Sequence, residues 1–207
     1  MKSIKISLIF WLLASASLQA QTFSIGGQLG YSSPKGDAFT DPVTKEKQSS
    51  FGLGFTFDAL YHLEDFDNRV AVGIMYDANA LFGKNSSDAF DIGIYGLSLY
   101  GIKGQFRLKE PEYVTFSPYA GLGLGLSQFS TPDVTYTDAS GNESTTYGKT
   151  VSSFGIRPEF GIDIEGFLLS VAYFIPMEYT VESNTGSFDG TAGVLTFALG
   201  YRYYLDI

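Results

Sequence analysis

Residues 195–207 read LTFALGYRYYLDI, and every second residue from Leu195 to Ile207 is apolar. The residues between them are small, polar or charged, apart from Tyr204. A period of two is typical of a β-strand whose two faces meet different surroundings. The segment therefore predicts a strand with one apolar face, and the same alternation recurs along most of the chain.

Seven further segments alternate in the same way. They span residues 22–32, 51–63, 70–82, 97–108, 116–128, 153–165 and 167–181. Pro158 and Pro176 lie inside the last two segments and have no N–H to donate to a neighbouring strand. We therefore expect a bulge at each of these prolines.

The connections between these segments alternate in length. Four are long and polar, at residues 34–49, 83–91, 129–150 and 182–191, and three are short, at residues 64–69, 109–115 and 165–166. Long loops at one end and short turns at the other are the layout of an outer-membrane barrel. We predict an all-β fold, a closed antiparallel eight-stranded outer-membrane β-barrel, with both termini on the periplasmic side.

A secreted soluble sandwich is the alternative, since its strands also alternate, but it would normally turn a charged face to water. Here the second face is mostly Gly, Ser and Thr with isolated charges, which suits a narrow interior. Aromatic residues on the apolar face also form two expected interfacial belts. One contains Tyr31, Phe51, Phe82, Phe154 and Tyr179 toward the long loops, and the other contains Phe23, Tyr61, Phe106, Phe167 and Tyr203 toward the turns.

Composition excludes several classes of protein. The chain has 207 residues, enough for one domain, and its 24 Gly, 18 Phe and 14 Tyr suit short, tightly packed strands. It has no Cys and one His, which excludes disulfides, thiolate metal sites and two-His zinc motifs. The net charge of −9 argues against nucleic-acid binding.

Residues 1–20 form a basic start, an apolar stretch and a small-residue end, the pattern of a secretory signal peptide. Cleavage after Ala20 is preferred to cleavage after Ala16, because a strand pattern begins directly afterwards. An uncleaved anchor is disfavoured, since the apolar stretch is shorter than the ~20 residues of a spanning helix. The mature barrel domain is then residues 21–207.

The export signal, the eight alternating segments and the run PYAGLGLG at residues 118–125 resemble the outer-membrane protein β-barrel domain family. This family includes OmpA-like and OmpX-like small barrels and opacity-type porins of Gram-negative bacteria. The resemblance implies contact with outer-membrane lipids and lipopolysaccharide, and folding by the barrel assembly machinery. One departure is the final residue, Ile207, where many members end in an aromatic residue.

Nine charged residues alternate with the apolar face and therefore point into a barrel. They are Asp58, Asp77, Lys103, Arg107, Arg157, Glu159, Asp163, Glu178 and Arg202. Isolated charge in a narrow lumen is costly, so we predict that Arg157 and Arg202 pair with Asp58 and Glu159 near mid-barrel. An ion path is the alternative, but eight strands enclose little more than their own side chains. We therefore expect this interior charge network to close the lumen.

Residues 129–150 are the most distinctive loop, with Thr and Tyr at strand-like density on either side of Ala139-Ser140-Gly141-Asn142. We expect an exposed hairpin here. Its edge could bind a partner by strand addition, with Tyr136, Asn142 and Tyr147 as candidate contacts. A merely solvated hairpin is equally compatible with the pattern.

The sequence identifies no catalytic residue, metal ligand or cofactor. His62, the single imidazole, lies at the turn end of its strand and is interpreted as structural. The leading hypothesis is a non-enzymatic, monomeric surface protein whose loops act in envelope integrity, adhesion or host contact, with an extracellular ligand at the loops. A small porin-like conduit for small or hydrophobic solutes is the alternative, and a lipid A-modifying enzyme is third.

Overall fold

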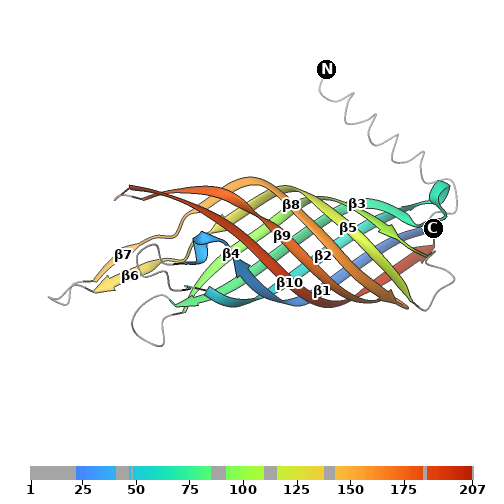
Figure 1. Ribbon diagram of the computed structural model, residues 1–207, viewed down its shortest axis with the longest axis horizontal. Helices are drawn as coiled ribbons and strands as arrows, with labels where there is room; N and C mark the ends of the chain where they lie inside the picture. Colours follow the sequence, from blue (N-terminus) through green and yellow to red (C-terminus); the bar gives the residue numbers. More distant parts are fainter. Residues whose placement is uncertain are drawn as a thin grey trace, which may run out of the picture.

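The computed structural model describes residues 22–40, 47, 49–84, 92–109, 116–137, 143–183 and 186–206. Eight strands close an antiparallel barrel in the order β1-β10-β9-β8-β5-β4-β3-β2 (Figure 1). They are β1 (Thr22–Lys35), β2 (Ser49–Leu63), β3 (Val70–Lys84), β4 (Ile92–Arg107), β5 (Ser117–Ser130), β8 (Thr150–Ile164), β9 (Phe167–Ser183) and β10 (Gly186–Asp206). The predicted all-β, closed eight-stranded fold is confirmed.

Short elements complete the described chain. Strands β6 (Val134–Thr137) and β7 (Glu143–Thr146) pair with each other as a ribbon, as expected for this loop. Two single 3-10 turns follow β1 and β2, η2 (Asp37–Phe39) and η3 (Glu64–Phe66). Within the described ranges, no helix is long and apolar enough to cross a membrane. The predicted signal peptide and its cleavage at Ala20 or Ala16 lie outside the described residues.

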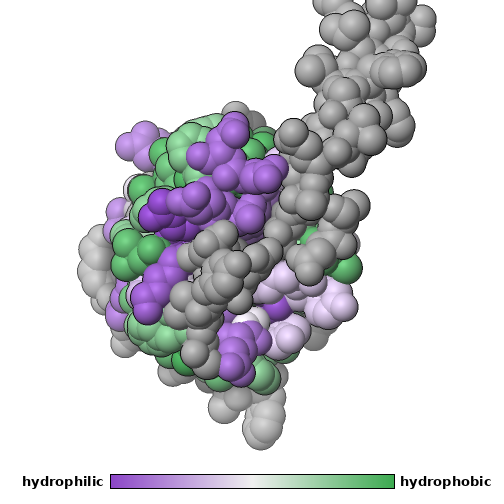
Figure 2. All heavy atoms as spheres, turned by 90° about the vertical axis from the view of Figure 1, so that its right-hand side faces the viewer, coloured by the Kyte–Doolittle hydropathy of each residue, from purple (hydrophilic) through white to green (hydrophobic). Residues whose placement is uncertain are grey.

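The barrel wall follows the period of two. Outward side chains are apolar and exposed, as at Leu29, Ile74 and Leu199, which are 69%, 63% and 67% exposed. Their neighbours along each strand, such as Gln28 and Met75, are buried in the interior. Figure 2 shows the result at the turn end, where hydrophilic residues gather across the opening and hydrophobic residues surround them.

A bulge in β9 interrupts this alternation. Phe174 pairs with Val194 and Met177 with Ala192, so β9 has two residues, Ile175 and Pro176, where β10 has one. The bulge expected at Pro176 is therefore confirmed. An extra residue reverses the faces of everything that follows it.

Two predictions on β9 are wrong for this reason. Tyr179, assigned to the outer aromatic belt, is only 4% exposed and points into the lumen. Glu178, assigned to the interior, is exposed. The predicted long connection at residues 182–191 is also wrong, because β9 and β10 continue to pair as far as Ser183 and Gly186.

Pro158 behaves differently from Pro176. The β5–β8 ladder passes through the pair Leu122–Pro158 without a register shift, so the bulge expected at Pro158 is absent from that ladder. On the other side of β8, the ladder to β9 ends at Glu159–Ala172, one residue before the proline. Pro158 thus marks the point where pairing between β8 and β9 ends, while pairing between β8 and β5 continues.

A closed barrel should resist detergent until it is heated. We predict that the protein in outer-membrane fractions migrates differently on electrophoresis before and after boiling in detergent, because only boiling unfolds the continuous ladder. Recovery as a soluble periplasmic protein whose migration is unaffected by heat would contradict the barrel.

Candidate functional site

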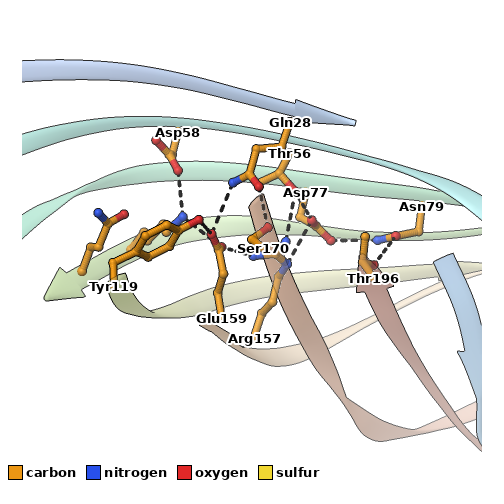
Figure 3. Close-up of polar contacts among 12 residues, drawn as sticks. Gln28, Thr56, Asp58, Asp77, Asn79, Tyr119, Arg157, Glu159, Ser170 and Thr196 are labelled. Carbon is orange, nitrogen blue, oxygen red and sulfur yellow. Dashed lines mark hydrogen bonds and ion pairs between the residues drawn. The ribbon is translucent and has the colours of Figure 1, made fainter. Parts of the chain in front are cut away.

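The lumen contains a charged network at mid-height, centred on the carboxylate of Glu159. This side chain is 0% exposed and accepts hydrogen bonds from four donors (Figure 3). They are Lys103 Nζ at 2.9 Å, Arg157 Nη1 at 2.7 Å, Tyr119 Oη at 2.8 Å and Gln28 Nε2 at 3.2 Å. Each carboxylate oxygen takes two of them, so the lost hydration is replaced from β1, β4, β5 and β8.

Asp58 and Arg202 form the second part of the network. Arg202 Nη2 donates to both carboxylate oxygens of Asp58, at 2.7 and 2.8 Å. The two residues come from β2 and β10, and both pair with Gly26 on β1, the strand between them. A Cβ at Gly26 would lie 2.7 Å from the Asp58 carboxylate, so glycine is what lets this ion pair cross over β1.

Arg157 joins the network to the opposite wall. Its Nε lies 3.0 Å from Asp77 Oδ1 on β3, and its Nη2 donates to Thr56 Oγ1 at 3.0 Å. Thr56 in turn donates to Asp77 at 2.7 Å. The described lumen buries four cations and four carboxylates, so its formal charges cancel. The cations are Lys103, Arg107, Arg157 and Arg202, and the carboxylates are Asp58, Asp77, Glu159 and Asp163.

The four residues named in the sequence analysis, Asp58, Arg157, Glu159 and Arg202, all lie in this network. Arg202 meets Asp58 and Arg157 meets Glu159, but the two pairs are joined through a residue that the sequence analysis did not name as a member. That residue is Lys103, whose ammonium lies 2.8 Å from Asp58 and 2.9 Å from Glu159. Its inward position was visible in the sequence, whereas its height relative to the other strands was not.

The candidate loop contacts are placed only in part. Tyr147 is 76% exposed beside the β6–β7 ribbon. The backbone of Tyr136 lies in β6, its side chain is not described, and Asn142 is outside the described residues. The structure therefore does not show these three side chains together.

The long-loop half of the lumen contains an apolar cluster, beside a few buried polar groups such as Ser32 and Asn79. Phe39 of η2 turns back into the barrel and is 2% exposed, with its ring 5.6 Å from Tyr95 and 5.7 Å from Phe129. The remaining buried members of this apolar cluster are Met75, Leu81, Leu97, Leu99, Phe129, Phe174, Tyr179, Ala192 and Val194. The sequence analysis missed this cluster, and the signal for it was the apolar pair Ala38-Phe39 inside a polar connection.

His62 is bonded at both ring nitrogens. Nε2 lies 2.9 Å from Ser24 Oγ, and Nδ1 lies 3.1 Å from the backbone oxygen of Asn68. A nucleophile and base would need an orienting acid and access for a substrate. Here a backbone carbonyl occupies the orienting position and both side chains are 0% exposed, so the contacts join β1, β2 and the turn after η3.

Comparisons with known proteins bear on the class of fold. No protein-family model matches the chain, and no curated protein matches its sequence. Among solved structures, Neisserial surface protein A matches with 14% identity and a TM-score of 0.50, over 87% of this chain and 97% of that one. Ail of Yersinia pestis, solved with a heparin analogue, matches with 15% identity over 89% and 100%, at a TM-score of 0.45. OprG of Pseudomonas aeruginosa matches with 15% identity over 89% and 97%, at a TM-score of 0.46.

The fold is therefore that of the small OmpA- and OmpX-like barrels of the bacterial outer membrane. At these identities the likeness shows the fold alone. The lumen itself must be judged from this chain's own residues.

Removing one member of the network should destabilise the barrel. Arg157→Ala leaves Asp77 and Glu159 without a shared cation, and losing one partner of a buried pair typically costs ~3–5 kcal/mol. We predict a markedly lower unfolding midpoint in detergent, whereas Lys149→Ala, at an exposed position outside the lumen, should leave the midpoint unchanged. Equal midpoints for both variants would show that the network does not stabilise the fold.

Proposed function

We propose that this protein is a non-enzymatic outer-membrane surface protein whose exposed loops act in envelope integrity, adhesion or host contact, while its lumen is closed. The observation that supports this most is the double closure of the lumen. An ion or solute passing along the axis would meet the apolar cluster below η2 and then the ion-paired network around Glu159. Eight strands leave little space beyond these side chains.

The shape of the long-loop end supports a role in binding. The β6–β7 ribbon and the β9–β10 hairpin both project from the left end in Figure 1. Backbone edges of such ribbons can accept an added strand from a partner. The fold is shared with a protein whose name describes a surface protein, which agrees with this assignment.

We infer the orientation in the membrane from the two ends of the barrel. Thr22 of β1 pairs with Asp206 of β10, so both terminal strands meet at the turn end. In the proposed orientation this end faces the periplasm, the signal peptide is removed after Ala20, and the long loops face outward. The proposed partners are outer-membrane lipids and lipopolysaccharide, the assembly machinery, and an extracellular ligand at the loops, with the barrel acting as a monomer.

Closure can be tested by electrical recording. We predict no steady conductance from the purified protein in planar bilayers. Phe39→Ala should also remain silent, because the charged network below the apolar cluster stays intact. A steady conductance that changes on charge removal at Arg157 or Glu159 would favour the porin-like alternative.

Orientation can be tested by labelling, because the chain has no cysteine of its own. Tyr147→Cys, at the long-loop end, should react with a membrane-impermeant maleimide on intact cells. Asp67→Cys, at an exposed position on the turn after η3, should react only after the outer membrane is permeabilised. The reverse pattern would place the loops in the periplasm.

A further inference from the structure

One pair of neighbouring strands in the barrel wall, β8 and β9, is hydrogen-bonded over only part of its length. Strand β8 pairs with β9 only from Glu159–Ala172 to Ile164–Phe167, although both strands continue toward the long loops. The described backbone has no ladder between residues 150–158 of β8 and residues 173–181 of β9, and we call this stretch the seam. On its two sides, by contrast, the β5–β8 ladder extends to Thr150 and the β9–β10 ladder to Ser183.

The sequence accounts for the seam. Pro158 and Pro176 lie on the two facing strands, and neither has an N–H to donate. In the lower part of the seam the outward side chains are apolar and exposed, with Phe154 at 56% and Ile175 at 36%, whereas Ser152, Glu178 and Thr180 are exposed nearer the long loops. The seam therefore reaches hydrocarbon depth, where backbone groups without partners are costly and normally occur only where they line a cavity or are covered by protein.

Side chains, in place of backbone hydrogen bonds, hold β9 against the barrel here. A Cβ on Gly155 of β8 would lie 3.1 Å from the Phe174 ring, so this ring packs against the bare backbone of the neighbouring strand. Tyr179 passes beneath β8, and its hydroxyl lies 2.7 Å from Ser127 Oγ on β5. We call Phe174 and Tyr179 the latch.

We propose that the seam is a lateral opening, through which one acyl chain of a membrane lipid reaches the apolar cluster in the long-loop half of the lumen. Opening breaks no ladder hydrogen bond and requires only that the latch side chains move. Lipid lies directly outside the seam, and Phe174, Tyr179 and Val151 of the apolar cluster lie inside it on the long-loop side of Arg157, so a hydrocarbon chain between them meets largely apolar surroundings.

A depression at the membrane-distal end of the seam suits the polar part of such a lipid. It measures about 370 Å³ and is lined by Lys149, Thr150, Val151 and Thr180. Hydroxyl and ammonium groups at this level can receive a headgroup while the chain lies in the seam below. The inference depends on the membrane setting of the barrel and is independent of the proposed role of the loops.

The test is quenching of tryptophan fluorescence by lipids with brominated acyl chains. The chain's single tryptophan, Trp11, lies in the proposed signal peptide, so the reporter Phe174→Trp is the sole tryptophan of the mature protein. The matched control is Leu168→Trp, on the same strand and equally buried at 2% exposed, but where the β8–β9 ladder is intact. Quenching should be several-fold stronger at position 174, approaching that of the outward-facing Phe160→Trp.

Closing the seam should abolish the difference. Ile156 and Ile175 would oppose each other if the register of Glu159 with Ala172 continued, so Ile156→Cys with Ile175→Cys provides a disulfide across the seam. Oxidation should reduce quenching at position 174 to the level of Leu168→Trp, reduction should restore it, and Tyr179→Phe should increase it.

Folding of each variant is checked by heat-modifiable migration. If Phe174→Trp does not fold, Phe129→Trp, in the same cluster but outside the latch, replaces it. Quenching at either lumen reporter that equals Leu168→Trp, or that is unaffected by the disulfide, would overturn the proposal. Loss of loop binding or a measured conductance would affect only the proposed function.

Discussion

Glu159 holds a negative charge where water does not reach it, and the arrangement of the lumen depends on how that charge is compensated. A buried carboxylate is tolerated only when donors replace its hydration and a cation balances it. Here the donors come from four strands, and the cations that balance Glu159 are themselves shared with Asp58 and Asp77. Moving one strand by two residues would separate several of these partners at once. The network therefore specifies strand register in a barrel whose outer face, being uniformly apolar, specifies it only weakly.

The lumen divides into two environments along its axis. The buried ion pairs lie from Arg157 and Asp77 toward the turns, and an apolar cluster with a few buried polar groups, such as Ser32, Asn79 and Ser127, occupies the part toward the long loops. The incomplete β8–β9 ladder falls beside the apolar part. Along most of its length the gap lies beside Phe174 and Tyr179, where apolar groups meet lipid, and only its lower end reaches Arg157, whose guanidinium is held by Asp77 and Glu159. The latch thus replaces backbone pairing mainly beside the apolar part of the interior.

The period of two predicts most of the wall from sequence, because outward and inward residues meet opposite media. It fails after Pro176, where one extra residue in β9 reverses the faces and places Tyr179 inside. Charges could be assigned to the lumen, but Lys103 could not be placed between Asp58 and Glu159, because its height depends on the tilt and register of strands far apart in sequence. Phe39 stood out as part of an apolar pair in a polar connection, but its place in the lumen could not be predicted, since a loop residue enters the lumen only through tertiary packing.

The ion pair across Gly26 ties an early strand of the barrel to its last strand. Asp58 lies on the second strand of the barrel, while Arg202 lies on β10, the last barrel strand in chain order. Until β10 docks beside β1, Asp58 has only Lys103 as a cationic partner and the open edge of β1 lacks its ladder. Charge compensation and edge closure are therefore completed in a single event. A chain without β10 would insert with Asp58 lacking Arg202 and with the edge of β1 unpaired. In this barrel, compensation of the buried charge therefore depends on closure of the last strand pairing.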